Sequence, residues 1–337
     1  MTTYRIVWIL IMCVVVAMAL SWISYVSIYQ RKEFPGKYKN FADTRGGKCF
    51  KEYFQDVLLV IVYHYPFYQT LPFILSQYKD AFPHILVCGP KPSAEFKIFT
   101  VDMGPGGYYS YECIGRAIRV HPGYRGYLYV NDDMVVNWWN FAKLDKEKIW
   151  KGAEIAVSVA HVINHRPIRD DWMWWKLESG LQSCERAFEK LSKLSGSPST
   201  TTRVNYKNML ATHFLNCGNR TLCLRTWSDF AYIPGRLSRN FEVLSSIFYK
   251  NKVFLEIALP TSLSLLEDWR HWEDAKGVYL PDVVGFRDFF NIKNVWPSFS
   301  GDATFLHPVK FFGNRGYHNR RIFKLRVLPY IEEYTSC

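Results

Sequence analysis

Apolar runs and polar turns alternate through the first half of the chain in a pattern typical of an α/β protein. Short apolar runs rich in β-branched residues suit strands that are buried on both faces, and the segments between them have helical spacing of apolar positions. Strand and helix therefore alternate, which predicts a mostly parallel, doubly wound sheet with helices on both faces. We expect strands at Asp56–Tyr63, Ile85–Cys88, Phe96–Val101 and Gly126–Asn131, and helices at Phe67–Phe82 and Tyr109–Val120.

The second half of the chain is less regular. Amphipathic spacing predicts helices at Glu178–Leu194 and Ser238–Tyr249. Apolar runs predict strands at Glu154–His161 and Val253–Leu259, the second with Glu256 in its middle.

An uncharged apolar run occupies the N-terminal region. Ile6–Ile28 would span about 34 Å as a helix, which is enough for the hydrocarbon core of a bilayer. A cleaved signal peptide is the alternative, although its apolar part usually has only about 7–15 residues. We therefore expect one N-terminal transmembrane signal-anchor at 6–28 after a short tail at 1–5, then a polar stem at 29–54 and a globular domain at 55–337.

The basic residues after this run and a glycosylation sequon further along the chain give conflicting signals about membrane orientation. Arg31, Lys32, Lys37 and Lys39 follow it, and by the positive-inside rule they would place the domain in the cytosol. The glycosylation sequon that begins at Asn219 points to the lumen instead.

Cysteines add to the luminal signal. Cys217 and Cys223 are near enough in sequence to close a small disulfide loop, whereas Cys88 and Cys113 suggest ordinary core thiols. We expect a single-pass type II protein with a luminal domain.

Composition limits the partners. The 337 residues are 49% hydrophobic, 17% aromatic and 21% charged, which argues against disorder. The formal net charge of +12 suits anionic partners such as phosphosugars, acidic glycans, lipid head groups or nucleic acid. Because the positive charge is spread along the chain and no zinc-finger or RNA-binding signature is present, we expect no nucleic-acid partner.

Two adjacent carboxylates carry the clearest candidate chemistry. Asp132 and Asp133 directly follow the apolar strand Gly126–Asn131. Ligands collect at the carboxyl ends of strands in open α/β sheets, and paired aspartates there can hold a hard divalent cation. Such pairs also occur in solvated turns and at helix N-caps.

This segment, from Gly126 to Asn137, resembles the acidic motif of GT-A glycosyltransferases, which is usually Asp-any-Asp after the fourth strand. The resemblance covers about Asp56–Asn137. It implies a nucleotide-binding half at 55–140, an acceptor half at 141–337, and a Mn²⁺ or Mg²⁺ ion that binds a nucleoside-diphosphate sugar. Asp133 matches the metal ligand and Asp132 a metal or ribose contact. Asn131 departs from the motif at its first position, which leaves room for a metal-independent or inactive relative.

The resemblance also implies roles outside the acidic motif. His307 would complete the metal shell, and Lys310 would hold the diphosphate. Arg116 would lie near the nucleotide, and Tyr63 or Tyr65 would stack on its base. Each has an ordinary alternative: a capped turn for His307, solvent for Arg116 and the core for the tyrosines.

The acceptor side is less defined. An inverting enzyme needs a carboxylate base, for which Glu256 is the first candidate and Asp302 and Asp229 are others. A retaining enzyme needs no such base in the same place, and the sequence leaves both courses open. The Trp-rich stretch Asp170–Leu177 suits a sugar-stacking platform, and equally a membrane-proximal or core segment.

The sequence therefore predicts a Golgi- or ER-resident, membrane-anchored glycosyltransferase that uses a nucleoside-diphosphate sugar and a glycan, glycoprotein or glycolipid acceptor. One alternative is a non-catalytic protein that binds glycans or partner enzymes on the same scaffold. Another is a cytosol-facing basic protein that binds anionic lipid or nucleic acid.

Overall fold

The computed structural model describes residues 50–153, 155–157, 172–196, 204–280 and 295–335. By its contacts the chain divides into two units, Met1–Lys48 and Cys49–Cys337, and the described residues all belong to the second. The expected anchor at 6–28, and all but the end of the stem, lie outside them. Within the described ranges, no helix is long and apolar enough to cross a membrane.

A mostly parallel seven-stranded sheet forms the centre of the fold, which confirms the predicted α/β class. Its strand order is β10-β6-β9-β4-β1-β2-β3, and β9 runs antiparallel to both of its neighbours. The strands are β1 (Val57–Val62), β2 (Ile85–Gly89), β3 (Phe99–Thr100), β4 (Gly126–Asn131), β6 (Trp150–Lys151), β9 (Phe230–Pro234) and β10 (Glu273–Asp274).

Two small sheets complete the strands. The first has the order β11-β12-β5, formed by Val278–Tyr279, Phe305–His307 and Val135–Val136. The second pairs β7 (Ala156–Val157) with β8 (Leu224–Arg225). Of the strand predicted at Glu154–His161, only β7 and Ile155 lie among the described residues.

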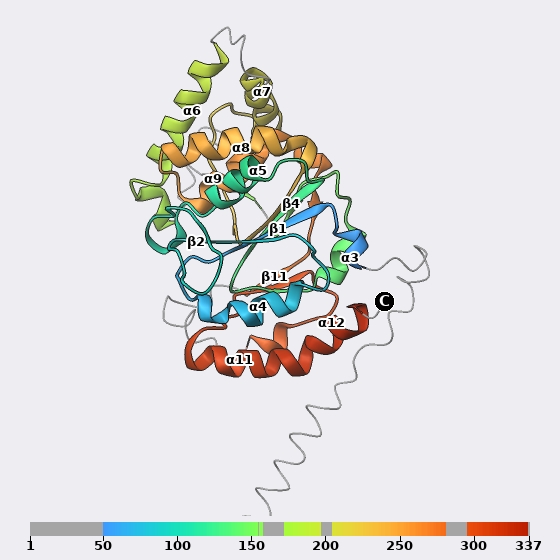
Figure 1. Ribbon diagram of the computed structural model, residues 1–337. Coiled ribbons are helices and arrows are strands. Elements are labelled where there is room, and N and C mark those ends of the chain that lie inside the picture. The colour runs from blue at the N-terminus through green and yellow to red at the C-terminus, as the bar shows by residue number, and fades with distance from the viewer. Residues whose placement is uncertain (1–49, 154, 158–171, 197–203, 281–294, 336–337) are drawn as a thin grey trace, which may run out of the picture. The chain divides into compact units, whose positions relative to one another are not determined.

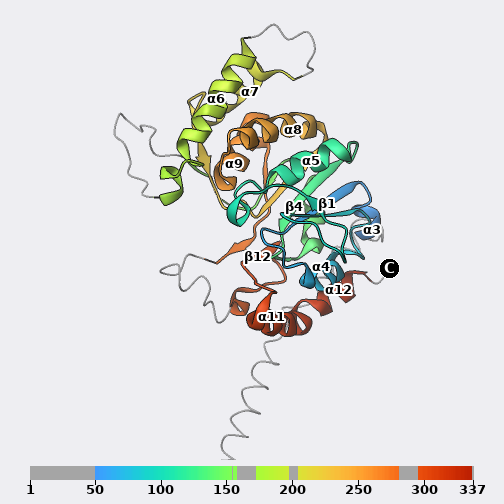
Figure 2. The same cartoon turned by 60° about the vertical axis from the view of Figure 1, so that its left-hand side comes forward.

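Helices cover the central sheet on both sides (Figures 1 and 2). On one side lie α5, α8 and α9, with α6 and α7 beyond them; on the other lie α4, α11 and α12. Their bounds are α3 (Phe50–Tyr53), α4 (Leu71–Tyr78), α5 (Glu112–Val120), α6 (Leu181–Ser195), α7 (Tyr206–Cys217), α8 (Gly235–Lys250), α9 (Leu255–Leu266), α11 (Gly313–Arg326) and α12 (Leu328–Thr335).

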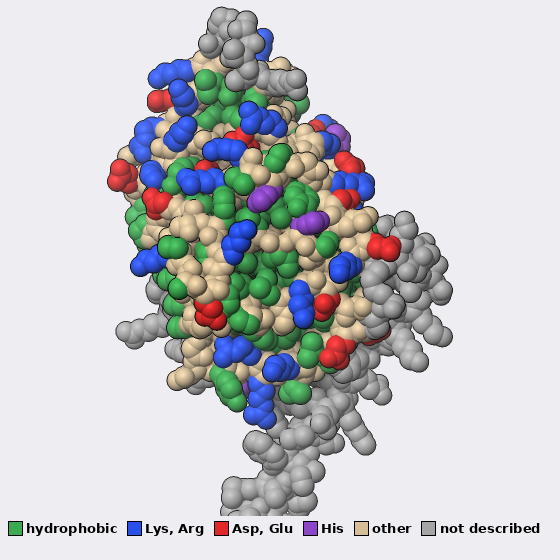
Figure 3. Space-filling view, viewed as in Figure 1, with side chains coloured by type: hydrophobic (Ala, Val, Ile, Leu, Met, Phe, Trp, Pro, Cys, Tyr) green, Lys and Arg blue, Asp and Glu red, His purple; other side chains and the backbone are tan. Residues whose placement is uncertain are grey.

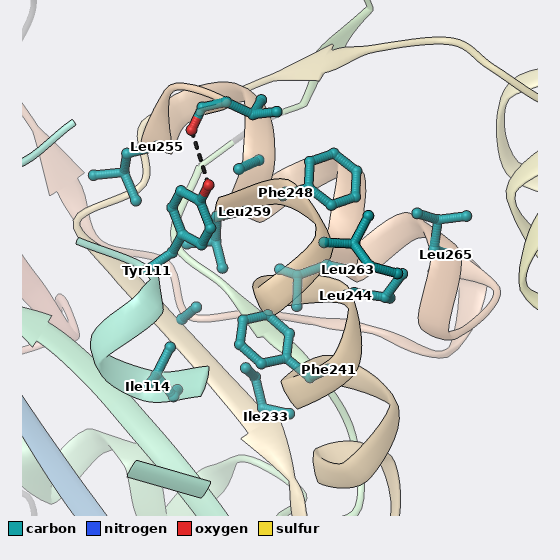
Figure 4. Close-up of a cluster of buried hydrophobic side chains, with 14 of the residues drawn as sticks. Tyr111, Ile114, Ile233, Phe241, Leu244, Phe248, Leu255, Leu259, Leu263 and Leu265 are labelled. Carbon is teal, nitrogen blue, oxygen red and sulfur yellow. Dashed lines mark hydrogen bonds between the residues drawn. The ribbon is translucent and has the colours of Figure 1, made fainter. Parts of the chain in front are cut away.

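A hydrophobic core cluster lies between the sheet and the α5, α8 and α9 helices (Figure 4). Phe241, Leu244 and Leu263 are all buried there. The hydroxyl of Tyr111 donates a hydrogen bond of 2.9 Å to the carbonyl of Val253, so this buried phenol is satisfied. The cluster fixes α9 against the sheet.

The strand predicted at Val253–Leu259 is wrong, because this segment starts helix α9. A short apolar run does not distinguish a buried strand from a buried helix. Pro260 lies inside the helix, where it removes one backbone hydrogen bond. The carbonyl left unpaired by a proline belongs to the residue four positions earlier, Glu256, and it accepts a hydrogen bond of 3.1 Å from the Thr226 N–H instead.

The cysteine predictions were also wrong. Cys88 and Cys113 form a disulfide that joins the end of β2 to α5, and Cys184 and Cys223 form another between α6 and the segment before β8. Cys217, the expected partner of Cys223, is a free thiol. Connectivity is not readable from spacing alone, because the fold decides which cysteines meet.

The predicted Trp-rich platform packs mainly into the protein where it is described. Trp175 is buried, and the ring of Trp174 stacks on Phe254 with a centroid distance of 4.7 Å. The core alternative therefore fits the described part of this stretch.

Candidate metal centre

The two aspartates that follow β4 lie at the carboxyl edge of the central sheet. Strands β1 and β4 run parallel and end together, with Val62 opposite Asn131. The backbone N–H of Asp132 donates a hydrogen bond of 3.0 Å to the Val62 carbonyl, so the chain stays on the sheet for one residue more before it turns. Asp133 therefore leaves the sheet at the edge where ligands collect in α/β folds.

Strand β9 brings a third carboxylate to this edge. Because β9 runs antiparallel to β4, the residue that precedes it, Asp229, lies beside the end of β4. Asn131 donates two hydrogen bonds to Asp229, from its N–H to the carbonyl at 3.1 Å and from its side-chain amide to Oδ1 at 2.7 Å. The residue that departs from the acidic motif thus holds another carboxylate in place.

Strand β12 brings a histidine from the far end of the chain. His307 ends β12, and its Nε2 lies 3.5 Å from Asp133 Oδ1 and 3.2 Å from Asp229 Oδ1. The Val309 N–H donates a hydrogen bond of 2.6 Å to the Asp133 carbonyl, and the ammonium of Lys310 contacts Asp133 Oδ2. The loop after β12 is therefore attached to the acidic turn through both backbone and side chain.

Asp133, Asp229 and His307 together form a candidate metal centre. One ligand atom from each lies within 4.8 Å of the other two. Carboxylate oxygens suit hard divalent cations, and an imidazole nitrogen broadens the choice to transition metals such as Mn²⁺. The side chains are partly or fully buried, so their oxygens and nitrogen are already gathered in a place of limited water access. The donor set is compatible with one divalent metal.

The electrostatics show how the cluster is balanced by its own cations. Burial would raise the pKa of Asp133, but Lys310 and His307 hold it well below its usual range. Burial would lower the pKa of His307, but Asp229 and Asp133 raise it to about 10. Burial and the neighbouring Asp133 raise the pKa of Asp132 to about 8. Two cationic groups thus neutralise the carboxylates, and a bound metal would replace the proton on His307.

A second histidine lies near the cluster. Burial lowers the pKa of His64, while the charges of Asp133 and Asp229 act to raise it. Its Nε2 is buried and has no hydrogen-bond partner among the described residues. Gly107, with φ of +82°, packs on the ring, where an added Cβ would lie only 2.4 Å from His64 Cγ.

The structure separates the residues expected at the nucleotide. Tyr63 is fully buried, and its hydroxyl shares a hydrogen bond of 3.0 Å with Thr70. Tyr65 is 53% exposed and stacks on Phe67, which stacks in turn on Phe312 with a centroid distance of 3.9 Å. Phe312, at the end of this aromatic row, follows Lys310 by two residues in the sequence.

Arg116 and the two predicted bases lie in different surroundings. Arg116 pairs with Glu112 one turn earlier on α5, at 3.1 Å. Asp302 is exposed in the turn before β12, and its charge acts on Tyr330 of α12. Glu256 lies in the first turn of α9, where its charge acts on Tyr279, the residue that pairs with His307 across β11 and β12.

From the sequence, Asp229 was expected only as a candidate general base. Asp229 stands directly before the apolar run Phe230–Pro234, a signal of the same kind as Asp133 after β4. Recognising it as a ligand required knowing that β9 runs antiparallel beside β4, which the sequence did not show.

Fold and site together define an α/β protein with a candidate divalent-metal centre at the carboxyl edge of a mostly parallel sheet.

Comparison with known proteins gives a distant relationship. The chain is 23% identical over 185 residues to the probable glycosyltransferase STELLO2 of Arabidopsis thaliana, and 24% identical over 185 residues to the probable glycosyltransferase STELLO1 of the same plant. Each match covers 54% of this chain and 21% of the relative, so it spans about a fifth of those relatives' length. No protein-family model matches the chain. The similarity supports a relationship to glycosyltransferases.

Proposed function

We propose that this protein is a membrane-anchored glycosyltransferase of the GT-A class that transfers a sugar from a nucleoside-diphosphate donor to a glycan-bearing acceptor. The observation that carries the proposal is the cluster of Asp133, Asp229 and His307, with Lys310 beside it. It lies where α/β folds bind ligands and has the donor set for a divalent metal. The distant similarity to probable glycosyltransferases agrees with this chemistry.

The donor side is assigned from the geometry of the cluster. A Mn²⁺ or Mg²⁺ ion would neutralise the charge that develops on the leaving diphosphate. Asp133, Asp229 and His307 would hold it, and Asp132 would contact the metal or the ribose. Lys310 would turn from Asp133 to the diphosphate as a second positive charge. Since Tyr63 and Arg116 already have partners in Thr70 and Glu112, we assign base stacking to the exposed ring of Tyr65.

On the acceptor side we assign Glu256 as the general base of an inverting reaction. This role is supported by the position of Glu256 in the first turn of α9, where its backbone carbonyl accepts a 3.1 Å hydrogen bond from Thr226, three residues before the candidate ligand Asp229. A base must lie within hydrogen-bond reach of the acceptor hydroxyl. Asp302 is a weaker candidate, because its charge acts on Tyr330 of α12.

Asn131 bears on the non-catalytic alternative. A lost aspartate was its main support, yet the Asn131 side chain donates a 2.7 Å hydrogen bond to Asp229. The departure from the motif therefore helps to position a ligand. We retain the catalytic proposal.

The proposed compartment is the lumen of the Golgi or ER, with 6–28 as a type II anchor. Two disulfides support an oxidising environment. On the face drawn in Figure 3, basic side chains are interspersed with acidic and polar ones, so this face offers no continuous basic surface for nucleic acid.

Asn219 is expected to carry an N-linked glycan. The sequon follows α7 on the surface, and the Asn219 side-chain oxygen accepts hydrogen bonds from the N–H and hydroxyl of Thr221, at 2.9 and 3.3 Å. The chain expressed in a secretory host should lose mass on treatment with a peptide N-glycosidase, and Asn219→Gln should abolish that loss. Asn208→Gln, on the exposed side of α7 outside a sequon, is the control. An unglycosylated wild-type chain would argue for a cytosolic domain.

Nucleotide binding tests the proposed function. The full-length protein would be titrated with UDP and GDP, with and without Mn²⁺, and its thermal unfolding followed. A ligand that binds the folded state raises the unfolding temperature. We expect stabilisation by one nucleotide only when Mn²⁺ is present. A folded protein that responds to neither nucleotide would overturn the donor site and favour a non-catalytic role.

A further inference from the structure

We propose that Trp227, with the ring of Tyr279 stacked behind it, forms a stacking wall for a pyranose ring of the acceptor, so that the acceptor class is a glycan bound through its sugar face. The inference rests on the proposed function and identifies a subsite next to the same metal centre. Neither residue belongs to the candidate ligand set.

The wall lies directly beside the metal ligands. Trp227 precedes Asp229 by two residues, and its ring stacks on Tyr279 with a centroid distance of 5.5 Å and an interplanar angle of 26°. The His307 ring lies 5.4 Å from the Tyr279 ring and 6.3 Å from the Trp227 ring. A sugar on this wall would therefore be next to the groups proposed to hold the donor.

Rigid elements support both rings. Tyr279 ends β11, which pairs in parallel with β12 so that Tyr279 lies opposite His307. The segment that carries Trp227 is attached to α9 through the Thr226 N–H, which donates to the Glu256 carbonyl that Pro260 leaves unpaired. Leu224 adds a second attachment, because its N–H donates a hydrogen bond of 3.0 Å to the Thr261 hydroxyl. Preorganised aromatic rings lose little conformational entropy when a ligand binds.

The chemistry of the wall fits a sugar. Trp227 is only partly buried, whereas Trp138, Trp150 and Trp296 are almost fully buried in the core. A partly exposed indole beside a polar cluster offers a flat apolar face, and the C–H groups of a pyranose present a matching one. Binding sites of this kind combine aromatic walls with a few placed polar groups.

Glu256 supplies such a polar group. Glu256 lies in the first turn of α9, and its backbone carbonyl accepts the 3.1 Å hydrogen bond from the Thr226 N–H that holds the Trp227 segment. One element thus positions both the proposed base and the stacking ring. A sugar stacked on Trp227 would be held next to the metal cluster.

Indole resonances test this wall. The full-length chain, labelled with ¹⁵N-tryptophan and kept in a detergent without a sugar head group, would be observed by NMR with UDP and diamagnetic Mg²⁺. Trp227→Phe identifies the Trp227 signal by its loss. Cellobiose, lactose and N,N′-diacetylchitobiose would serve as pyranose probes. We expect at least one to shift that signal.

Two variants then separate stacking from structure. Trp227→Phe keeps a ring and should bind the active probe within a few-fold of the wild type. Trp227→Ala should weaken it about tenfold, which corresponds to about 1.4 kcal/mol, because the stacking face is lost. Affinity for Mg²⁺ with UDP is measured in both variants, so that a loss confined to the disaccharide is distinguished from a disturbed donor site.

The results that would contradict the acceptor wall differ from those that would contradict the proposed function. A Trp227 signal that responds to no disaccharide, or to UDP-sugars but not to disaccharides, overturns the acceptor wall while the donor site stands. Equal probe affinity in Trp227→Ala and the wild type also overturns it. Absence of UDP binding in the wild type would instead contradict the proposed function.

Discussion

Replacing Asp133 with asparagine is expected to reduce Mn²⁺-dependent nucleotide binding and transfer by about 100-fold or more. Asp133 supplies one ligand oxygen of the cluster and contacts both Lys310 and His307. Metal stabilisation of a leaving diphosphate contributes several kcal/mol, and each 1.4 kcal/mol is a factor of ten. Asparagine keeps the shape but removes the charge, so the fold should survive. Isothermal titration with Mn²⁺ and the responding nucleotide measures the effect.

Asp80→Asn is the matched control, because Asp80 is an exposed carboxylate in the turn after α4. It should bind Mn²⁺ and nucleotide as the wild type does. If Asp133→Asn also bound both with unchanged affinity, the aspartate pair would be a turn and not a ligand.

Removing the Cys88–Cys113 disulfide is expected to lower the free energy of unfolding by about 3 kcal/mol. The bond closes a loop of 25 residues between β2 and α5, and loops of this size give stabilisation of about 2–4 kcal/mol. Both sulfurs lie in the core, so Cys88→Ala with Cys113→Ala avoids leaving two buried thiols. Urea unfolding of the full-length protein measures the difference.

Cys217→Ala provides the comparison, since Cys217 is a free, partly buried thiol. It should cost clearly less than the double substitution. Equal losses in the two variants, together with thiol labelling of Cys88 and Cys113 in the wild type, would show that the disulfide does not form.

The first half of the fold could be predicted from the sequence because each signal there is local. The predicted strand Gly126–Asn131 has the bounds of β4, and Ile85–Cys88 differs from β2 by one residue. Continuous β-branched runs bounded by glycine and proline are characteristic of buried parallel strands. The predicted helix Tyr109–Val120 begins three residues early, where the chain is still in turns before α5.

The second half could not be predicted as well, because tertiary contacts decide it. The α9 helix tolerates Pro260 because Thr226, distant in sequence, satisfies the carbonyl that the proline leaves unpaired. Cysteine pairing likewise depends on which elements meet: α5 packs over β2, and no spacing rule contains that information.

The candidate site shows the same division. Asp133, His307 and Lys310 were expected together from the resemblance, and the structure brings them into contact. Asp229 was not expected as a ligand, because its place depends on the antiparallel register of β9. Trp227 was not singled out at all, although it stands two residues before that carboxylate. Site residues that strand pairing brings together cannot be predicted until the order of the strands is known.

The most direct measurement for the central claim is an anomalous difference map from crystals of the protein grown with Mn²⁺ and the nucleotide that stabilises it. We predict one strong manganese peak within ligand distance of Asp133, Asp229 and His307, with the diphosphate between the metal and Lys310. A peak at another place, or a nucleotide bound there without any metal, would contradict the account.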